Sequence, residues 1–344
     1  MRTPVDYSPA FSAFCARFPP TVKTIVMAII GSQHPSAMAA ESAKATQRIL
    51  SFMKDANAPK HYDLASVTDT SGFYNEVVLA YWDSLLSYST WRTSSGFESW
   101  WDGLDPALEP HGWFQEVFTP SMDRVETIYS EVQPGMPLEG HGVMSDSLSG
   151  PVCEHVYWGS MRDRLPAGQI DELVGEEGAI TEQERTVDTR KSRVKVPGKQ
   201  NLCLIRSGQD WSKTKPEERK LYLETMHPVL IEGMRFLRDQ GDEVGCYSCR
   251  LMSVLDSKTS SSDTDQTFGL AYFDDIAGLE KWSKQHKTHL DIFGGFLGYV
   301  TKLDMQVALH LYHEVFVLQP EQQVFEYVGC HSRTGMLGGM TGRS

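Results

Sequence analysis

Two histidines near the end of the chain fall in one apolar run, and alternation along that run separates them. His310 and His313 belong to the string ALHLYHEV at positions 308–315. Successive side chains of a strand point to opposite faces, so residues three apart face opposite sides. His313 shares its side with apolar residues of the string, where a charged imidazole without a partner is costly to bury. His313 is therefore expected to be either neutral or engaged in proton transfer, whereas His310 faces away.

A third histidine, His289, lies just beyond a predicted helix at 276–286. The inward stripe of that helix is apolar, with Ile276, Leu279 and Trp282 in helical spacing. An imidazole beside such a stripe can ligate a metal or a cofactor iron, or can be a packed histidine that bonds a backbone group. Spacing alone favours the packed histidine and leaves ligation as the alternative.

Three other polar residues stand near the ends of predicted elements. Ser207 follows the predicted strand 201–205 in the string IRSGQ, which lacks the first glycine of a G-x-S-x-G nucleophile elbow and so disfavours a serine hydrolase. Arg164, in the string RDR, follows the strand-like VYW, and without further information a surface salt bridge at a strand end is the favoured explanation. Glu126 carries no distinguishing pattern of its own. Residue types and spacing thus indicate a polar site but name no reaction.

Composition disfavours several classes of protein. The chain has 344 residues, with 32 Lys and Arg against 45 Asp and Glu, and its net charge of −13 argues against nucleic-acid binding, which needs clustered cations. Its longest apolar stretch, at 24–31, is far shorter than the ~20 residues that cross a membrane. The first residues lack the pattern of a secretory signal, and six scattered cysteines favour reduced thiols. We therefore expect a cytoplasmic protein.

One cysteine pair has the spacing of a redox or metal motif. Cys246 and Cys249 form a C-x-x-C inside a strand-like run. Odd spacing in a strand predicts that the two thiols point to opposite faces. The sequence therefore favours two unconnected thiols over a redox or zinc site.

The elements that must position these residues alternate apolar runs with amphipathic helices. The predicted strands are 22–30, 75–82, 201–205, 244–255, 267–273 and one or two within 305–318, and the predicted helices are 36–54, one after 82, 215–239 and 276–286. Two polar stretches, 134–151 and 166–199, are typical of loops.

An internal echo suggests that one unit occurs twice. The string LAYWD at 79–83 matches LAYFD at 270–274, and at the same offset Trp91 falls opposite Trp282. With the matching order of elements, this predicts an α+β protein of two β-α-β-β-α-β halves, each ferredoxin-like, with helices on one face of an antiparallel sheet. The predicted organisation is an N-terminal extension (1–21), a first half (22–165), a charged connecting loop (166–199) and a second half (200–344).

Several long strings resemble the haem-containing aldoxime dehydratases. They occur in family order from about residue 22 onward, while 166–199 shows no clear match. The strings are DTSGF (69–73), YWGSMRDR (157–164), LIRSGQDW (204–211), GCYS (245–248), THL (288–290), LYHEV (311–315), VFEY (324–327) and TGML (334–337). A match of eight consecutive residues such as YWGSMRDR is far more specific than a short motif.

The resemblance implies roles for the residues singled out above. It makes His289 the proximal ligand of haem b, His313 the distal catalytic histidine, Ser207 a distal hydroxyl and Arg164 the distal arginine. Glu126 is carried over more weakly, because the string around it is short. These residue types suit the loss of water from an aldoxime, because a histidine can protonate a leaving hydroxyl and then accept a carbon-bound proton.

The implied reaction is dehydration of an aldoxime, R–CH=N–OH, to a nitrile and water, with the oxime nitrogen on ferrous haem. The family fold also implies two ferredoxin-like halves of the dimeric α+β barrel type, haem against the sheet, and a homodimer. The alternative is a haem peroxidase of the dye-decolourising type or a non-catalytic haem-binding module, because a distal His–Arg pair also serves peroxide cleavage. A requirement for dithionite rather than peroxide distinguishes these functions.

Overall fold

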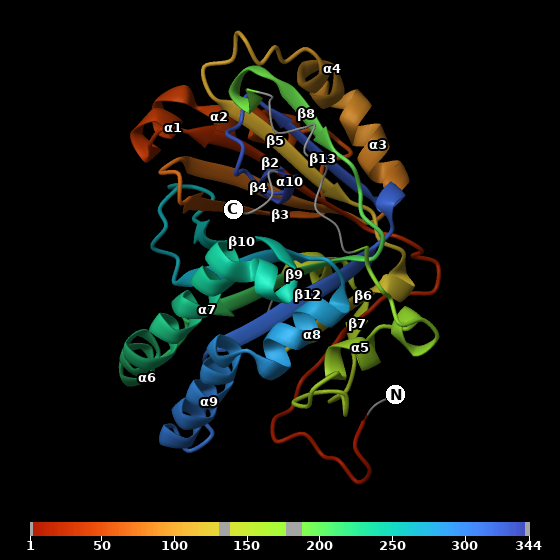
Figure 1. Ribbon diagram of the computed structural model, residues 1–344, viewed down its shortest axis with the longest axis vertical. Coiled ribbons are helices and arrows are strands. Elements are labelled where there is room, and N and C mark those ends of the chain that lie inside the picture. The colour runs from red at the N-terminus through yellow and green to blue at the C-terminus, as the bar shows by residue number, and fades with distance from the viewer. Residues whose placement is uncertain (1–2, 131–137, 177–187, 341–344) are drawn as a thin grey trace.

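One large antiparallel sheet organises the molecule. The computed structural model describes residues 3–130, 138–176 and 188–340. Within these ranges the sheet has eleven strands, in the order β6-β12-β9-β11-β10-β3-β4-β2-β5-β13-β8, with every pairing antiparallel. The sheet curls, so that strands from the two parts of the chain enclose a shared core and helices cover the outside (Figure 1). The predicted α+β class is confirmed.

The first part of the chain supplies four neighbouring strands in the order β3-β4-β2-β5. Its strands are β2 (Val26–His34), β3 (His61–Thr68), β4 (Tyr74–Trp82) and β5 (Gly112–Phe118). Its helices are α1 (Ala37–Ala43), α2 (Ala45–Phe52), α3 (Leu85–Ser94) and α4 (Phe97–Asp102). The single helix predicted at 36–54 is two helices, because Lys44 takes a left-handed conformation with φ of 53°.

The second part supplies four strands in the order β12-β9-β11-β10, and β10 pairs with β3 to join the two parts. Its strands are β9 (Leu202–Asp210), β10 (Cys246–Leu255), β11 (Gln266–Phe273) and β12 (His310–Leu318). Its helices are α6 (Pro216–Leu221), a π-helical turn (Tyr222–Met226), α7 (His227–Gln240), α8 (Ile276–Gln285) and α9 (Lys287–Lys302). None of the helices in the described ranges is both long and apolar enough to cross a bilayer.

Short strands extend the sheet at both edges. β6 (Val125–Tyr129) adds to β12, and β13 (Gln323–Val328) and β8 (Arg193–Val196) add to β5. A separate pair joins β1 (Ala16–Arg17) to β7 (Ser147–Leu148), and two short helices, α5 (Ser160–Arg164) and α10 (Leu337–Met340), complete the regular structure. β8 lies inside the stretch 166–199 that the sequence predicts to be a loop. Residues 177–187 of that stretch and 134–137 of the other predicted loop (134–151) lie outside the described residues.

Alternation along the strands separates the buried layers. Leu79 of β4 and Leu270 of β11 are fully buried in the core that the two parts share. Val78 faces the other way, into a layer beneath α2, α3 and α4. Cys203 of β9 and Val315 of β12 belong to the corresponding layer beneath α7 and α8. The helix-facing side of β9 and β12 is therefore the surface on which a site under the second helical layer is built.

Helix starts follow local capping chemistry. The Ser84 side chain accepts a hydrogen bond from the Ser87 amide at the start of α3, and Asp275 accepts one from Gly278 at the start of α8. Such oxygens satisfy amides that have no partner within the helix. The repeated aspartates of the internal echo, Asp83 and Asp274, therefore precede the actual caps by one residue.

Three local predictions were wrong. Arg164 lies on helix α5 rather than at the end of a strand, and this helix starts after Gly159, whose φ of 99° favours glycine. Ser207 lies inside β9, which runs on to Asp210. Cys246 and Cys249 are both buried in the layer beneath α7 and α8, because a β-bulge between 246 and 248 shifts the alternation.

Candidate functional site

Ser207 and His313 face each other across two neighbouring strands. They are register partners in the β9–β12 pair, an arrangement that places Cβ atoms ~5 Å apart. Ser207 lies on the same face of β9 as Cys203, and His313 lies on the same face of β12 as Val315. Cys203 and Val315 point toward the helical layer. Those two neighbours are fully buried, whereas the His313 side chain is 22% exposed. The layer therefore opens at the point where these two polar side chains lie.

Glu126 brings a buried carboxylate to the same place from the edge strand β6. It lies opposite Val315 in the β6–β12 pair, two residues along from the partner of His313 and on the same face. Its Oε1 atom is 2.7 Å from Nε2 of His313, and its side chain is only 1% exposed. A carboxylate at this distance orients the imidazole and stabilises its charged form.

Arg164 completes the cluster from helix α5. Its Nε donates to Oε2 of Glu126 at 2.7 Å, its Nη2 lies 3.3 Å from Oε1, and Nη2 is also 3.1 Å from Nε2 of His313. Its Nη1 donates to the carbonyl of Glu154 at 2.5 Å. The guanidinium is 5% exposed, so this bidentate pair is shielded from solvent.

Charge pairing, and not exposure, keeps Glu126 ionised. Burial by itself raises the pKa of the Glu126 carboxyl, but Arg164 and then His313 lower it, to about 2. The carboxylate in turn helps to raise the pKa of Arg164 against the opposing effect of burial. A permanent anion and cation thus flank the Nε2 atom of His313. With a proton on Nε2 the ring donates to Glu126, and without one it accepts from Arg164.

His289 lies in the first turn of α9, next to the rings of two tryptophans. Its ring lies 4.7 Å from that of Trp282 and 6.2 Å from that of Trp158, and Trp158 also contacts Phe293. Burial lowers the pKa of His289 to about 4, although the Ser283 backbone acts in the opposite direction. Its Nδ1 atom is buried without a hydrogen-bond partner among the described residues. A neutral imidazole with an unsatisfied nitrogen is the state that a haem iron accepts as a ligand.

All five predicted site residues therefore border the layer between the helices and the strands β6, β12 and β9. His289 reaches this layer from α9, which packs on α7 and α8, and Trp282 of α8 belongs to its core. Figure 1 shows α8 and α9 beside β12 and β9, with α5 at the edge next to β6. His310, by contrast, pairs with Glu139 at 3.0 Å on the opposite side of β12, as alternation predicts.

Sequence reasoning missed one histidine of this region. His155 lies in the irregular segment before α5, and burial, followed by the positive charges of Arg164 and His313, lowers its pKa to about 4. Because the segment has no periodicity and His155 belongs to none of the matched strings, no pattern in the sequence marks it.

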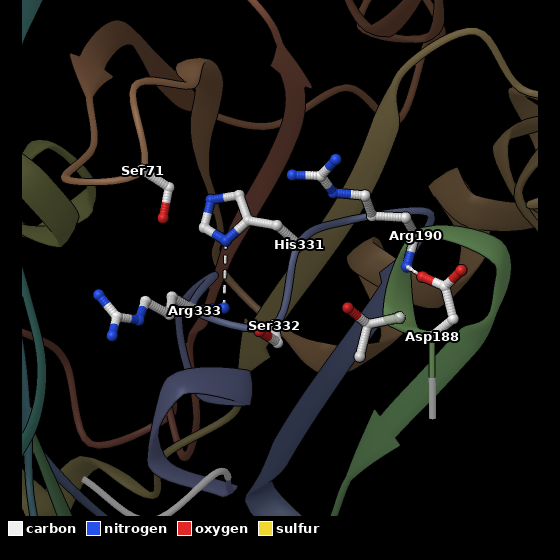
Figure 2. Close-up of a pocket in the computed structure, with 7 residues that line it drawn as sticks. Ser71, Asp188, Arg190, His331, Ser332 and Arg333 are labelled. Atoms are coloured by element: carbon white, nitrogen blue, oxygen red, sulfur yellow. Dashed lines mark hydrogen bonds between the residues drawn. The ribbon is translucent and has the colours of Figure 1, made fainter. Parts of the chain in front are cut away.

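A hollow in the surface lies apart from this cluster. It encloses about 330 Å³ and is lined by Ser71, Asp188, Thr189, Arg190, His331, Ser332 and Arg333 (Figure 2). Both ring nitrogens of His331 are engaged, since Nε2 bonds Asp69 and Nδ1 accepts from the Arg333 amide. None of the five predicted residues lines this hollow, so the sequence and the geometry favour the His313 cluster as the site.

Comparison with known proteins gives consistent matches over nearly the whole chain. A family model described as haem-containing dehydratase matches residues 28–336. The aliphatic aldoxime dehydratase of Pseudomonas chlororaphis is 37% identical over 340 residues, 98% of this chain and 93% of that protein. The phenylacetaldoxime dehydratase of Bacillus sp. (strain OxB-1) is 32% identical over 340 residues, 97% of this chain and 93% of that protein. A crystal structure of aldoxime dehydratase in complex with butyraldoxime superposes with a TM-score of 0.88 at 35% identity, covering 98% of this chain and 91% of that one.

Proposed function

The chain belongs to the haem-containing dehydratase family, and on that premise we propose that it converts aldoximes to nitriles and water at the His313 cluster. As a member of the family it is a haem-dependent dehydratase. Its curated relatives are named for aliphatic aldoximes and for phenylacetaldoxime, and the solved relative holds butyraldoxime. The observation that carries the proposal is the buried Glu126–His313–Arg164 cluster opposite Ser207.

His289 is the residue suited to hold the haem iron. Its imidazole is neutral, half-buried and flanked by Trp282 and Trp158, whose flat apolar surfaces suit a porphyrin. The haem, once bound and ferrous, supplies an iron that takes a nitrogen ligand and donates electron density. The distal polar residues lie on the sheet side of the same layer.

His313 is the residue suited to move protons. Glu126 and Arg164 both engage its Nε2 atom, which leaves Nδ1 as the ring nitrogen to exchange a proton with the substrate. As imidazolium, His313 donates that proton to the departing oxime oxygen, which leaves as water when the N–O bond breaks. The neutral ring then accepts the proton from carbon, and the C–H electron pair becomes part of the triple bond. The two transfers balance and return His313 to its starting state.

Ser207 and the ion pair have different duties. The Ser207 hydroxyl, directly across from His313, is placed to hold the oxime oxygen with a hydrogen bond that strengthens as charge develops there. Glu126 stabilises the imidazolium and fixes which nitrogen carries the retained proton. Arg164 pairs with Glu126 and balances the charge of this buried carboxylate.

We also propose that the two sets of four strands are ferredoxin-like halves, at 22–165 and 200–344, with 1–21 as an extension and 166–199 as the connection. The strand order of each set supports this. Counted outward from the junction between β10 and β3, the strands of each set follow the order second, third, first, fourth of that half. The register supports it residue by residue. Gly31 lies beneath the Phe114 ring on the neighbouring strand, and Gly208, at the matching position, lies beneath Tyr312.

The shared core repeats the same symmetry. The Tyr81 hydroxyl of the first half donates to Glu314 of the second, and the Tyr272 hydroxyl of the second half donates to Glu116 of the first at 2.5 Å. Tyr81 and Tyr272 belong to the repeated strings, and the two glutamates match through the strand registers. Each half thus supplies a buried tyrosine to the carboxylate of the other.

The first half lacks the proton-transfer group at the position that corresponds to His313. That position holds Gln115, which donates to Glu326, and Glu326 also binds Arg193 at 2.7 Å and the Trp101 indole at 2.9 Å. A carboxylate and an arginine are thus present, but Gln115 has no group that titrates. Trp101 packs in the layer beneath α2, α3 and α4. This supports a single haem site per chain, in the second half.

The proposal is tested by supplying haem and substrate under controlled redox conditions. The purified chain, reconstituted with haem and reduced with dithionite without oxygen, is expected to yield nitriles from butyraldoxime or phenylacetaldoxime. Peroxide-dependent dye oxidation without nitrile formation would instead indicate the peroxidase alternative. A homodimer and a cytoplasmic location remain predictions, which size-exclusion chromatography and cell fractionation test.

A further inference from the structure

The N-terminal segment runs beside the strand that carries Glu126. Phe14 and Tyr129 of β6 exchange backbone hydrogen bonds of 2.8 and 3.0 Å, and the Ala16 amide donates to Oγ1 of Thr127 at 2.8 Å. Residues 3–17, here called the N-terminal strap, thus contact the outer side of β6 through one isolated bridge at Phe14 and the bond from Ala16. Glu126 lies between this strap and β12.

The first residues of the strap hold the segment before α5. The Tyr7 hydroxyl donates to the carbonyl of His155 at 2.6 Å, and the rings of Tyr7 and Tyr157 meet edge to face at 5.1 Å. Oγ1 of Thr3 lies 3.0 Å from the Tyr157 hydroxyl. The strap therefore contacts this segment at the His155 carbonyl and at the Tyr157 side chain.

The held segment in turn contacts helix α5 at two neighbouring residues, Arg164 and Asp163. The carbonyl of Glu154 accepts from Nη1 of Arg164, so the backbone of this segment fixes one end of the guanidinium. The Tyr157 hydroxyl donates to Oδ2 of Asp163 at 2.7 Å, next to Arg164 on α5. Burial and Asp163 raise the pKa of Tyr157 to about 12, although Thr3 opposes the shift, so the phenol stays protonated and available as a donor.

The backbone of the held segment is itself strained. Val156, between the two anchored residues His155 and Tyr157, has a φ of +61°. A β-branched residue rarely adopts this conformation, which persists only where surrounding contacts impose it. The helix that carries Arg164 has just five residues, too few to fix a long side chain by itself.

We propose that the N-terminal strap and Tyr157 position Arg164 on Glu126 and His313, so that Tyr157 is a positioning residue for the dehydration. This inference rests on the proposed function of the cluster. Without the Tyr157 hydroxyl, α5 and the 154–157 segment lose their common anchor. The guanidinium then samples positions away from the carboxylate, which lowers the fraction of enzyme with a correctly paired His313.

The experiment is a double-mutant cycle on haem-loaded enzyme. We expect Tyr157→Phe to lower kcat about 10-fold, with KM, haem content and the ferrous spectrum with aldoxime nearly unchanged. In an Arg164→Ala background, the same substitution is expected to change kcat less than about 2-fold, because the group that it positions is gone. Tyr62→Phe, at a partly exposed tyrosine of β3 in the first half, is the matched control and should leave kcat unchanged.

A second variant keeps the inference open to refutation if Tyr157→Phe folds poorly. Deleting residues 1–12 removes Thr3 and Tyr7 but leaves the pairing of Phe14, and should reproduce the loss in kcat with the same non-additivity toward Arg164→Ala. Unchanged kcat in both Tyr157→Phe and the deletion of residues 1–12, or additive losses in the cycle, would overturn the inference. If Arg164→Ala itself leaves kcat intact, the proposed function of the cluster fails instead.

Discussion

Removing the charge of Glu126 tests the site through stability and activity together. The carboxylate is 1% exposed and accepts hydrogen bonds from Nε and Nη2 of Arg164 and from Nε2 of His313. Glu126→Gln keeps the shape of the side chain but leaves the buried guanidinium without a counter-charge. The substitution therefore isolates the electrostatic contribution of this one group.

The size of the effect follows from the pKa. Folding lowers the pKa of Glu126 from an ordinary 4.5 to about 2, and at ~1.4 kcal/mol per unit this corresponds to about 3 kcal/mol in favour of the folded carboxylate. Because the folded pKa is the lower one, this stabilisation is complete above about pH 4.5 and is lost as pH falls toward 2. Between pH 5 and 8 the difference between wild type and variant is therefore expected to be constant.

Urea unfolding of the haem-free protein measures this difference. With a slope of about 3 kcal/mol per M, Glu126→Gln should lower the midpoint by about 1 M at both pH 5 and pH 8. Its kcat in the haem-loaded state should fall at least ~10²-fold, because general acid–base catalysis by His313 depends on the pair.

The carboxylate of Glu326, which binds Gln115 of the first half, offers a matched control for that experiment. Glu326→Gln removes a buried carboxylate that binds Arg193, and should also destabilise the protein, but it should leave kcat intact. Equal loss of kcat in both glutamine variants, or an unchanged urea midpoint in Glu126→Gln, would refute the assignment of Glu126 to the catalytic cluster.

Four further outcomes are expected. His289→Ala should lose haem, seen as loss of the Soret band, with partial recovery on adding imidazole; a full Soret band in this variant would point to another ligand. His313→Ala should retain haem and aldoxime binding but lose ~10²–10⁴-fold in turnover, whereas His310→Ala should change turnover little, and the reverse order would show that the strand register is wrong. Ser207→Ala should stay haem-loaded with turnover reduced ~10²–10³-fold, and labelling of Ser207 by a phosphonate would contradict a hydrogen-bonding role. Because folding lowers the pKa of His289, haem-free wild type should lose stability as pH falls from about 6.5 to about 4, and His289→Ala should lose less over the same range by urea unfolding.

The strands of the second half could be predicted where their periodicity was unbroken. The predicted strand 267–273 and helix 276–286 agree with β11 and α8 to within one residue, because apolar alternation and helical spacing are local properties. The opposite faces predicted for Cys246 and Cys249 were wrong, since the bulge that buries both side chains depends on pairing with β11, whereas both thiols are free as predicted. The strand end predicted for Arg164 is instead a short helix, which begins after the left-handed turn at Gly159.

The sequence by itself determined which histidine of β12 faces the layer beneath the helices. Alternation alone separates His313 from His310, because it depends only on the geometry of an extended backbone. The tertiary structure decided what surrounds His313. Glu126 and Arg164 reach it across 187 and 149 residues of chain, from an edge strand and a five-residue helix, and no local pattern encodes such a meeting. The pairing of β6 with β12 brings the Glu126 carboxylate to the His313 imidazole. The register of this pair is set by contacts between residues distant in sequence, so no local pattern predicts it.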